Sequence, residues 1–189
     1  TGWLAGKEMA EECNGKANIL MIVSDKNITN QVERLRGFHA AIRTYPDMKV
    51  ADMLECGSSV LTAQKLVTKV MEEQPEINAI FCAEGIGTGA CCYVMEKQNR
   101  KVGDSMHIIG YDYNGLTKRS IEEGYLSACI QQGSRQMGEL AAQVLDKYLN
   151  EGIRPAKTIH THASLIRRDN MQEAEKIDSE NVKVEWNYY

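Results

Sequence analysis

The sequence predicts an α/β fold in which a doubly wound, mostly parallel sheet is flanked by helices. Nearly continuous apolar runs occur at Asn18–Val23, Ala79–Cys82 and His107–Gly110, and such runs are typical of strands buried on both faces. Segments with a helical spacing of apolar residues separate these runs. Because strands and helices alternate in this way, a parallel sheet with helices on both faces is the expected architecture.

The first half of the chain supplies three predicted helices and two predicted strands. The helix Gly2–Cys13 is expected to end at Asn14-Gly15, because glycine favours the left-handed conformation that terminates helices. The other elements of this half are the strand Asn18–Val23, a helix that Thr29 or Asn30 caps and that runs to about Tyr45, the edge strand Lys49–Leu54, and a helix that Ser59 caps and that ends near Gln74-Pro75.

The second half continues the alternation from the strand Ala79–Cys82. A helix starts at the glycine run Gly85–Ala90 and leads to the strand His107–Gly110. The elements that follow are a short helix over Asn114–Glu123, a strand over Leu126–Ile130, an amphipathic helix that Ser134 caps and that runs to Asn150, an extended segment over Thr158–Ile166, and a polar tail whose end, Asp178–Tyr189, has no clear pattern.

Charge and composition exclude several classes of function. The 189 residues carry a formal net charge of −4 and no basic stripe, which predicts no nucleic-acid binding. No apolar run approaches the ~20 residues of a membrane-spanning helix. The first residues are predicted to be helical and not a signal peptide. Since the chain also starts without methionine, we expect Thr1 to mark a cut in a longer protein.

The six cysteines and four histidines do not form a predicted metal site. No two cysteines have C-x-x-C spacing, and the pair His160 and His162 lies far from any of them, so we predict no metal and no cofactor. Small buried hydrophobic side chains are the simpler interpretation of the cysteines. Six cysteines without a regular spacing argue against a scaffold held together by disulfides.

Carboxylates follow two of the predicted central strands. Glu84 comes after Ala79–Cys82, and Asp112 comes after His107–Gly110. Open α/β sheets bind ligands outside the carboxyl ends of their strands, so both carboxylates are expected in one crevice. The loops at the ends of the first two strands add Asp25, Asn27 and Ser58 as candidate contacts, although a turn or capping role is the simpler interpretation of these three.

The glycine run also fits a dinucleotide-binding fingerprint. Gly85–Ala90 has the pattern G-x-G-x-x-A after a strand, and Asp112 follows at roughly the spacing expected for ribose recognition. However, Glu84 places a negative charge beside the would-be phosphate, and the motif does not follow the first strand. Glycines that allow close helix–strand packing are the favoured interpretation.

Taken in order, several motifs resemble the C-terminal half of type 1 periplasmic sugar-binding proteins of the ribose-binding kind. The match extends from Thr1 to about Asn170. It rests on the helix start Leu4–Ala10, the R-x-x-G-F motif Arg34–Phe38, Pro75–Phe81, Ile109–Asp112, Ala128–Gln132 and Gly138.

The resemblance implies a set of ligand contacts. Asp112 matches the aspartate that accepts hydrogen bonds from sugar hydroxyls, and Gln132 matches the hinge glutamine. Glu84 replaces an asparagine, Val32 an arginine, and Ser58 an aromatic residue. These departures predict a more acidic cleft, one that takes a cationic or amino-bearing solute or a differently hydroxylated sugar. Glu84 is expected to meet ligand donors, a cation or water, because a buried lone carboxylate is costly.

The resemblance also implies an organisation. Residues 1–131 would form the second lobe of a solute-binding protein. Residues 132–162 would contain a hinge and a segment returning to an absent first lobe, and 163–189 the third crossing, final strand and polar tail. Because the helix Ser134–Asn150 would lack the sheet it packs on, we expect a homodimer through residues 134–166.

The predicted function is a non-enzymatic, extracytoplasmic solute-binding module, with no signal present in this chain. Its partners would be a small sugar-like or amino-bearing solute and a membrane transporter or sensor kinase. Two alternatives stay open: the effector domain of a LacI-type transcription regulator, and a nucleotide-dependent enzyme.

Overall fold

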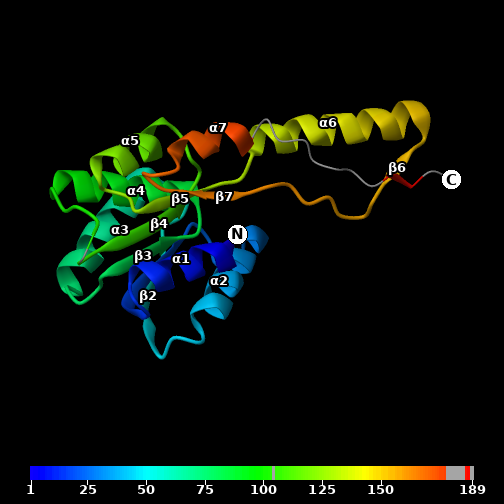
Figure 1. The fold of residues 1–189 in the computed structure, drawn as a ribbon. Helices are drawn as coiled ribbons and strands as arrows, with labels where there is room; N and C mark the ends of the chain where they lie inside the picture. The colour runs from blue at the N-terminus through cyan, green and yellow to red at the C-terminus, as the bar shows by residue number, and fades with distance from the viewer. Residues whose placement is uncertain (104, 178–185, 188–189) are drawn as a thin grey trace.

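The protein is described by a computed structural model that covers residues 1–103, 105–177 and 186–187. A six-stranded sheet in the order β2-β1-β3-β4-β5-β7 forms its centre (Figure 1). The strands are β1 Lys16–Val23, β2 Asp47–Glu55, β3 Ala79–Cys82, β4 His107–Tyr111, β5 Ala128–Gln131 and β7 Ser164–Ile166. β1 to β5 are mutually parallel and β7 is antiparallel to β5, so the predicted mostly parallel sheet is confirmed.

Helices cover both faces of this sheet. One face packs against α1 Gly2–Glu12 and α2 Thr29–Ile42, and the other against α3 Val60–Glu73, α4 Gly85–Lys97 and α5 Gly115–Glu123. Alternate residues of β1 divide between these two cores, with Leu20 and Ile22 facing α3 and α4. A strand whose side chains are buried on both faces has a continuous run of apolar residues, which explains the apolar run in the sequence of β1.

Most predicted elements are found within a few residues of their expected bounds. Ser59 caps α3 as expected, by accepting a hydrogen bond from the Thr62 amide. Two capping expectations are wrong. Ile28 occupies the N-cap of α2, and Gly133, with φ of +62°, occupies the N-cap of α6 in place of Ser134. Only Ser164–Ile166 of the predicted extended segment pairs as a strand.

Helix α6 (Ser134–Glu151) leaves the sheet instead of covering it (Figure 1). Among its residues only Gln136 is buried, and Met137, Leu145, Tyr148 and Leu149 are exposed. The described residues therefore leave the apolar face of α6 uncovered. Beyond α6, β6 Arg154–Pro155 pairs with β8 Trp186–Asn187, a pairing that the sequence does not signal.

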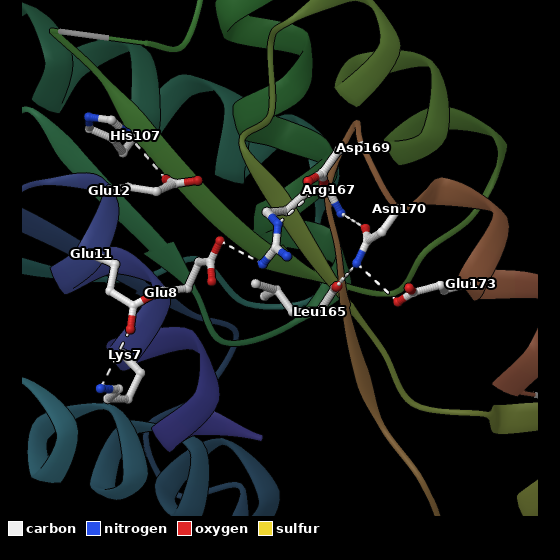
Figure 2. A network of polar contacts seen from close by, with 10 residues as sticks. All are labelled: Lys7, Glu8, Glu11, Glu12, His107, Leu165, Arg167, Asp169, Asn170 and Glu173. Atoms are coloured by element: carbon white, nitrogen blue, oxygen red, sulfur yellow. Dashed lines mark hydrogen bonds and ion pairs between the residues drawn. The ribbon is translucent and has the colours of Figure 1, made fainter.

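The C-terminal segment is tied back to α1 by a polar network. After β7, Arg167 donates to Glu8 of α1 at 2.9 Å, while Asn170 donates to the Leu165 carbonyl and to Glu173 (Figure 2). The short helices η1 Met171–Glu173 and α7 Ala174–Ile177 follow. Of the predicted polar tail, residues 178–185 and 188–189 lie outside the described residues.

None of the helices in the described ranges combines the length and the apolar composition that a membrane crossing requires.

Candidate functional site

A cleft of about 750 Å³ lies at the carboxyl edge of the parallel sheet. Its floor comes from the turns after β3, β4 and β5, and its walls come from helices α2, α3, α4 and α5. This is the position at which open α/β sheets bind ligands. Its lining includes Arg34, Glu84, Gly85, Asp112 and Gln132.

Glu84 is buried at the start of α4, where it serves as the N-cap of that helix. Its carboxylate accepts hydrogen bonds from the backbone amides of Ile86 and Gly87. The premise that this carboxylate is buried without a partner is therefore wrong, because the helix N-terminus supplies two donors. Its contact with a ligand, a cation or water stays a prediction. Burial raises the pKa of Glu84, and these two hydrogen bonds oppose that shift.

A chain of hydrogen bonds connects Arg34, Gln132 and Asp112. Arg34 on α2 donates to the Ala83 carbonyl and to Oε1 of Gln132, both at 2.7 Å. The amide of Gln132 then donates to Oδ1 of Asp112 at 3.0 Å. The Arg34 guanidinium also lies over the Tyr111 ring, 4.0 Å from its centroid. This chain holds three side chains from separate elements in one arrangement facing the cleft.

Asp112 has an unusual backbone conformation that directs its carboxylate into the cleft. Its φ is +68°, in the left-handed region that aspartate and asparagine tolerate better than most residues. A Cβ at Gly85 would come within 2.4 Å of Oδ2 of Asp112, so the absence of a side chain there leaves room for this carboxylate. Within the described residues, hydrogen bonds reach Oδ1 of Asp112, and Oδ2 is left as an acceptor toward the cleft.

The structure brings together three of the six residues that the sequence suggests as contacts. Glu84, Asp112 and Gln132 all line the cleft. Ser58, Asp25 and Asn27 do not line it. Ser58 is exposed in the turn before α3, and Oδ1 of Asp25 accepts from the Asn27 amide in a local turn. This turn matches the simpler interpretation that the sequence favours for Asp25 and Asn27.

Arg34 is a central cleft residue that sequence reasoning missed. The expectation of a cleft without an arginine was drawn from Val32, but the guanidinium comes from Arg34, two residues further along α2. The cleft lining therefore contains the cations Arg34 and Arg119 beside the anions Glu84, Glu96 and Asp112. Arg119 and Glu96 pair at 3.1 Å on the rim, so the cleft is nearer to neutral than the sequence suggests.

The glycine run packs closely and does not form an open phosphate cradle. A Cβ at Gly87 would come within 2.7 Å of both Ile22 of β1 and Oε1 of Glu84. The amides that would hold a phosphate at this helix N-terminus already donate to Glu84. Among residues 1–103, 105–177 and 186–187, no three histidine, cysteine or acidic side chains are placed to hold a metal ion.

Known proteins that are similar to this chain match it over about nine tenths of its length. The "HTH-type transcriptional repressor PurR" of Aliivibrio salmonicida is 25% identical over 175 residues, which are 88% of this chain and 49% of the repressor. An ABC transporter solute-binding protein from Agrobacterium vitis, solved with bound D-fucose, has a TM-score of 0.86 at 23% identity. That match covers 93% of this chain and 60% of the other.

A third match is a chain of the "XylFII-LytSN complex", with a TM-score of 0.80 and 28% identity over 90% of this chain and 59% of that one. The chain spans about half the length of the curated relatives it matches. A family model described as "Periplasmic binding protein domain" matches residues 1–153. With its mostly parallel sheet and flanking helices, the chain belongs to the periplasmic binding protein domain family.

Proposed function

We propose that this chain is part of a non-enzymatic solute-binding module that recognises a small polar ligand, a sugar or a sugar-like molecule. Such a module works by closure, because a ligand that contacts both walls of a cleft favours the closed state. Residues 1–131 act as one lobe, and the segment from 132 carries the hinge. Gly133, with a φ of +62° just after β5, supports a change of chain direction there.

The observation that carries the proposal is the chain of hydrogen bonds that ends at Asp112. A sugar hydroxyl donates to one group and accepts from another, and carboxylate and amide side chains suit both roles. Asp112 offers Oδ2 as an acceptor, while Gln132 and Arg34 hold this carboxylate in place. A site whose polar groups are held before binding loses less conformational entropy when the ligand arrives.

The charges of the cleft favour a neutral polyhydroxylated or amino-bearing ligand over an anion. Both ends of the Arg34 guanidinium are engaged, at the Ala83 carbonyl and at Gln132. Arg119 donates to Glu96 on the rim. An incoming carboxylate or phosphate would therefore have to displace existing partners and would also meet Asp112.

A thermal-shift screen of pentoses, hexoses and amino sugars tests the proposal. A ligand present at 100 times its Kd stabilises by ~2.7 kcal/mol, which for a chain of this size raises Tm by about 5–10 °C. Asp112→Asn keeps the left-handed backbone and removes the charge, so we expect it to lose the shift. Asp25→Asn makes the same chemical change outside the cleft and should keep it. No shift with any sugar, or an unchanged shift in Asp112→Asn, would contradict the proposal.

The partner and the compartment follow from the same proposal. We infer an extracytoplasmic module that presents its closed state to a membrane transporter or a sensor kinase. The Agrobacterium vitis neighbour is named as an ABC transporter solute-binding protein, which supports the transport role. XylFII is found in a complex with a second protein, which supports a protein partner.

A regulator of the LacI type is the second candidate, and the similarity to PurR favours it. Both candidates use the same kind of cleft, so ligand binding alone does not separate them. The sequence upstream of Thr1 in the intact gene does. A helix-turn-helix there would identify a regulator, and a signal peptide or lipoprotein cysteine would identify a binding protein.

The exposed face of α6 underlies a further proposal, that two copies of this chain associate through residues 134–166. Leu145 and Tyr148 line a groove of about 750 Å³ together with the segment from Arg154 to Lys157. Exposed apolar surfaces of this kind commonly mark association sites. Sedimentation velocity across a range of concentrations tests for a dimer, and a monomer throughout would refute it.

A further inference from the structure

Two thiols lie against each other directly behind the wall of the cleft. Cys82 is the last residue of β3, and Cys91 lies in the second turn of α4. Their Sγ atoms are 3.5 Å apart, and both residues are completely buried. Two of the other four buried cysteines have sulfur contacts of their own. Cys56 faces the Gly57 carbonyl and Glu84, and Cys129 faces the Ile130 carbonyl.

The chain between these two cysteines forms a large part of the cleft. Glu84, Gly85, Ile86 and Gly89 all lie between Cys82 and Cys91, and all four line the cleft. The turn is held by the hydrogen bonds from the α4 amides to Glu84. A covalent bond between the two sulfurs would therefore close a short ring containing this wall.

We propose that Cys82 and Cys91 form a reversible intramolecular disulfide that ties β3 to α4 behind the cleft. A disulfide needs a sulfur–sulfur distance of ~2.05 Å, so the two atoms must approach by about 1.5 Å. The two cysteines belong to packed neighbouring elements, and side-chain rotation can supply part of that movement.

The oxidant is a low-molecular-weight disulfide such as oxidised glutathione. One protein thiolate attacks a sulfur of glutathione disulfide and releases one glutathione thiolate, giving a mixed disulfide. The second cysteine, after losing its proton, attacks the protein sulfur of that mixed disulfide and releases the second glutathione. Two protein thiols and one glutathione disulfide thus become one protein disulfide and two reduced glutathiones.

Burial determines when this exchange takes place. The pKa of Cys82 is raised, mainly by its hydrogen bond with Cys91 and secondly by burial. Little thiolate therefore exists in the folded protein. An oxidant also has no direct path to side chains that are completely buried. Oxidation therefore occurs while the protein folds or when this region opens, and the folded reduced form persists until then.

Refolding in a glutathione redox buffer tests the proposal. The protein is refolded with oxidised glutathione, its native circular dichroism is verified, and free thiols are then alkylated under denaturing conditions. Of the six cysteines, four should be alkylated in the intact mass. A glutamyl endopeptidase that cuts after Glu84 separates Cys82 from Cys91, so the disulfide should join two peptides. Reduction should separate these peptides and lower Tm by a few degrees.

Adjacent cysteines provide the matched variants. Cys92→Ala should keep the joined peptides, whereas Cys91→Ala should abolish them. Six alkylated cysteines in the oxidised, folded protein, or joined peptides that persist in Cys91→Ala, would overturn the proposal. If Cys91→Ala does not fold, the wild-type mass and the Cys92→Ala peptide map still decide the outcome.

Discussion

Removal of the Glu84 side chain should destabilise the protein through the start of α4. Glu84→Ala leaves the amides of Ile86 and Gly87 without their acceptor, and Gly87 is buried. Loss of an N-cap costs about 0.5–2 kcal/mol, and a buried donor left unpaired costs ~1–3 kcal/mol. Because the substitution also removes a carboxylate that burial disfavours, we expect a net loss of about 1–2 kcal/mol.

Glu84→Asn distinguishes the contribution of the N-cap hydrogen bonds to stability from that of the carboxylate charge. Asparagine is among the best N-cap residues and carries no charge, so this variant should lie within about 0.5 kcal/mol of the wild type at pH 7. Urea denaturation followed by circular dichroism measures both variants, and a loss of 1–2 kcal/mol corresponds to a fall in Tm of about 2–8 °C. Glu72→Ala, on the exposed side of α3, is the control and should change little.

Two results would refute this account of Glu84. If Glu84→Ala is as stable as Glu72→Ala, the hydrogen bonds to the amides of Ile86 and Gly87 contribute nothing measurable. If Glu84→Asn is as unstable as Glu84→Ala, the charge and not the cap is what the fold requires.

Three further predictions test other parts of the account. Burial raises the pKa of Glu84 in the folded state above 4.5, its pKa in the unfolded chain. The free energy of unfolding should therefore fall as pH rises from 4.5 through the folded-state pKa. Urea titrations across pH should show a smaller fall for Glu84→Gln. Gly110→Ala places a Cβ 2.3 Å from Thr88 and should cost ~1–3 kcal/mol, whereas Gly138→Ala meets nothing within 4 Å and should gain about 0.5–1 kcal/mol in the same assay. Leu145→Glu puts a charge on the exposed α6 face and should abolish any dimer in sedimentation velocity; an unchanged dimer would locate the interface elsewhere.

The fold could be predicted from the sequence because its central strands are buried on both faces. Runs such as Ala79–Cys82 admit few other interpretations, and the helices between them have clear apolar faces. The short pairing of β6 with β8 could not be predicted, since two-residue strands carry no periodic signal. The caps of α2 and α6 were misplaced because helix boundaries depend on backbone geometry, and Gly133 supplies that geometry at α6.

The candidate site was partly predictable, because topology determines where strands end but not which partners the side chains there contact. Strand ends fix Glu84 and Asp112 at one edge of the sheet, so their position follows from topology. Topology does not determine which hydrogen-bond donors a carboxylate contacts, and for this reason the capping role of Glu84 was missed. Arg34 was missed because its side chain reaches the cleft from a helix; the signal available was a cation one turn into the helix after a strand-end loop.

The central claim is that the cleft around Asp112 binds a hydroxylated solute, and NMR chemical-shift mapping tests it most directly. Titration with the sugar that gives the largest thermal shift should move the amide signals of Gly85, Asp112 and Gln132 saturably, even when affinity is only millimolar. Asp112→Asn should weaken this binding at least tenfold, which corresponds to ~1.4 kcal/mol or more. Signals that move only outside the cleft, or an affinity unchanged in Asp112→Asn, would contradict the account.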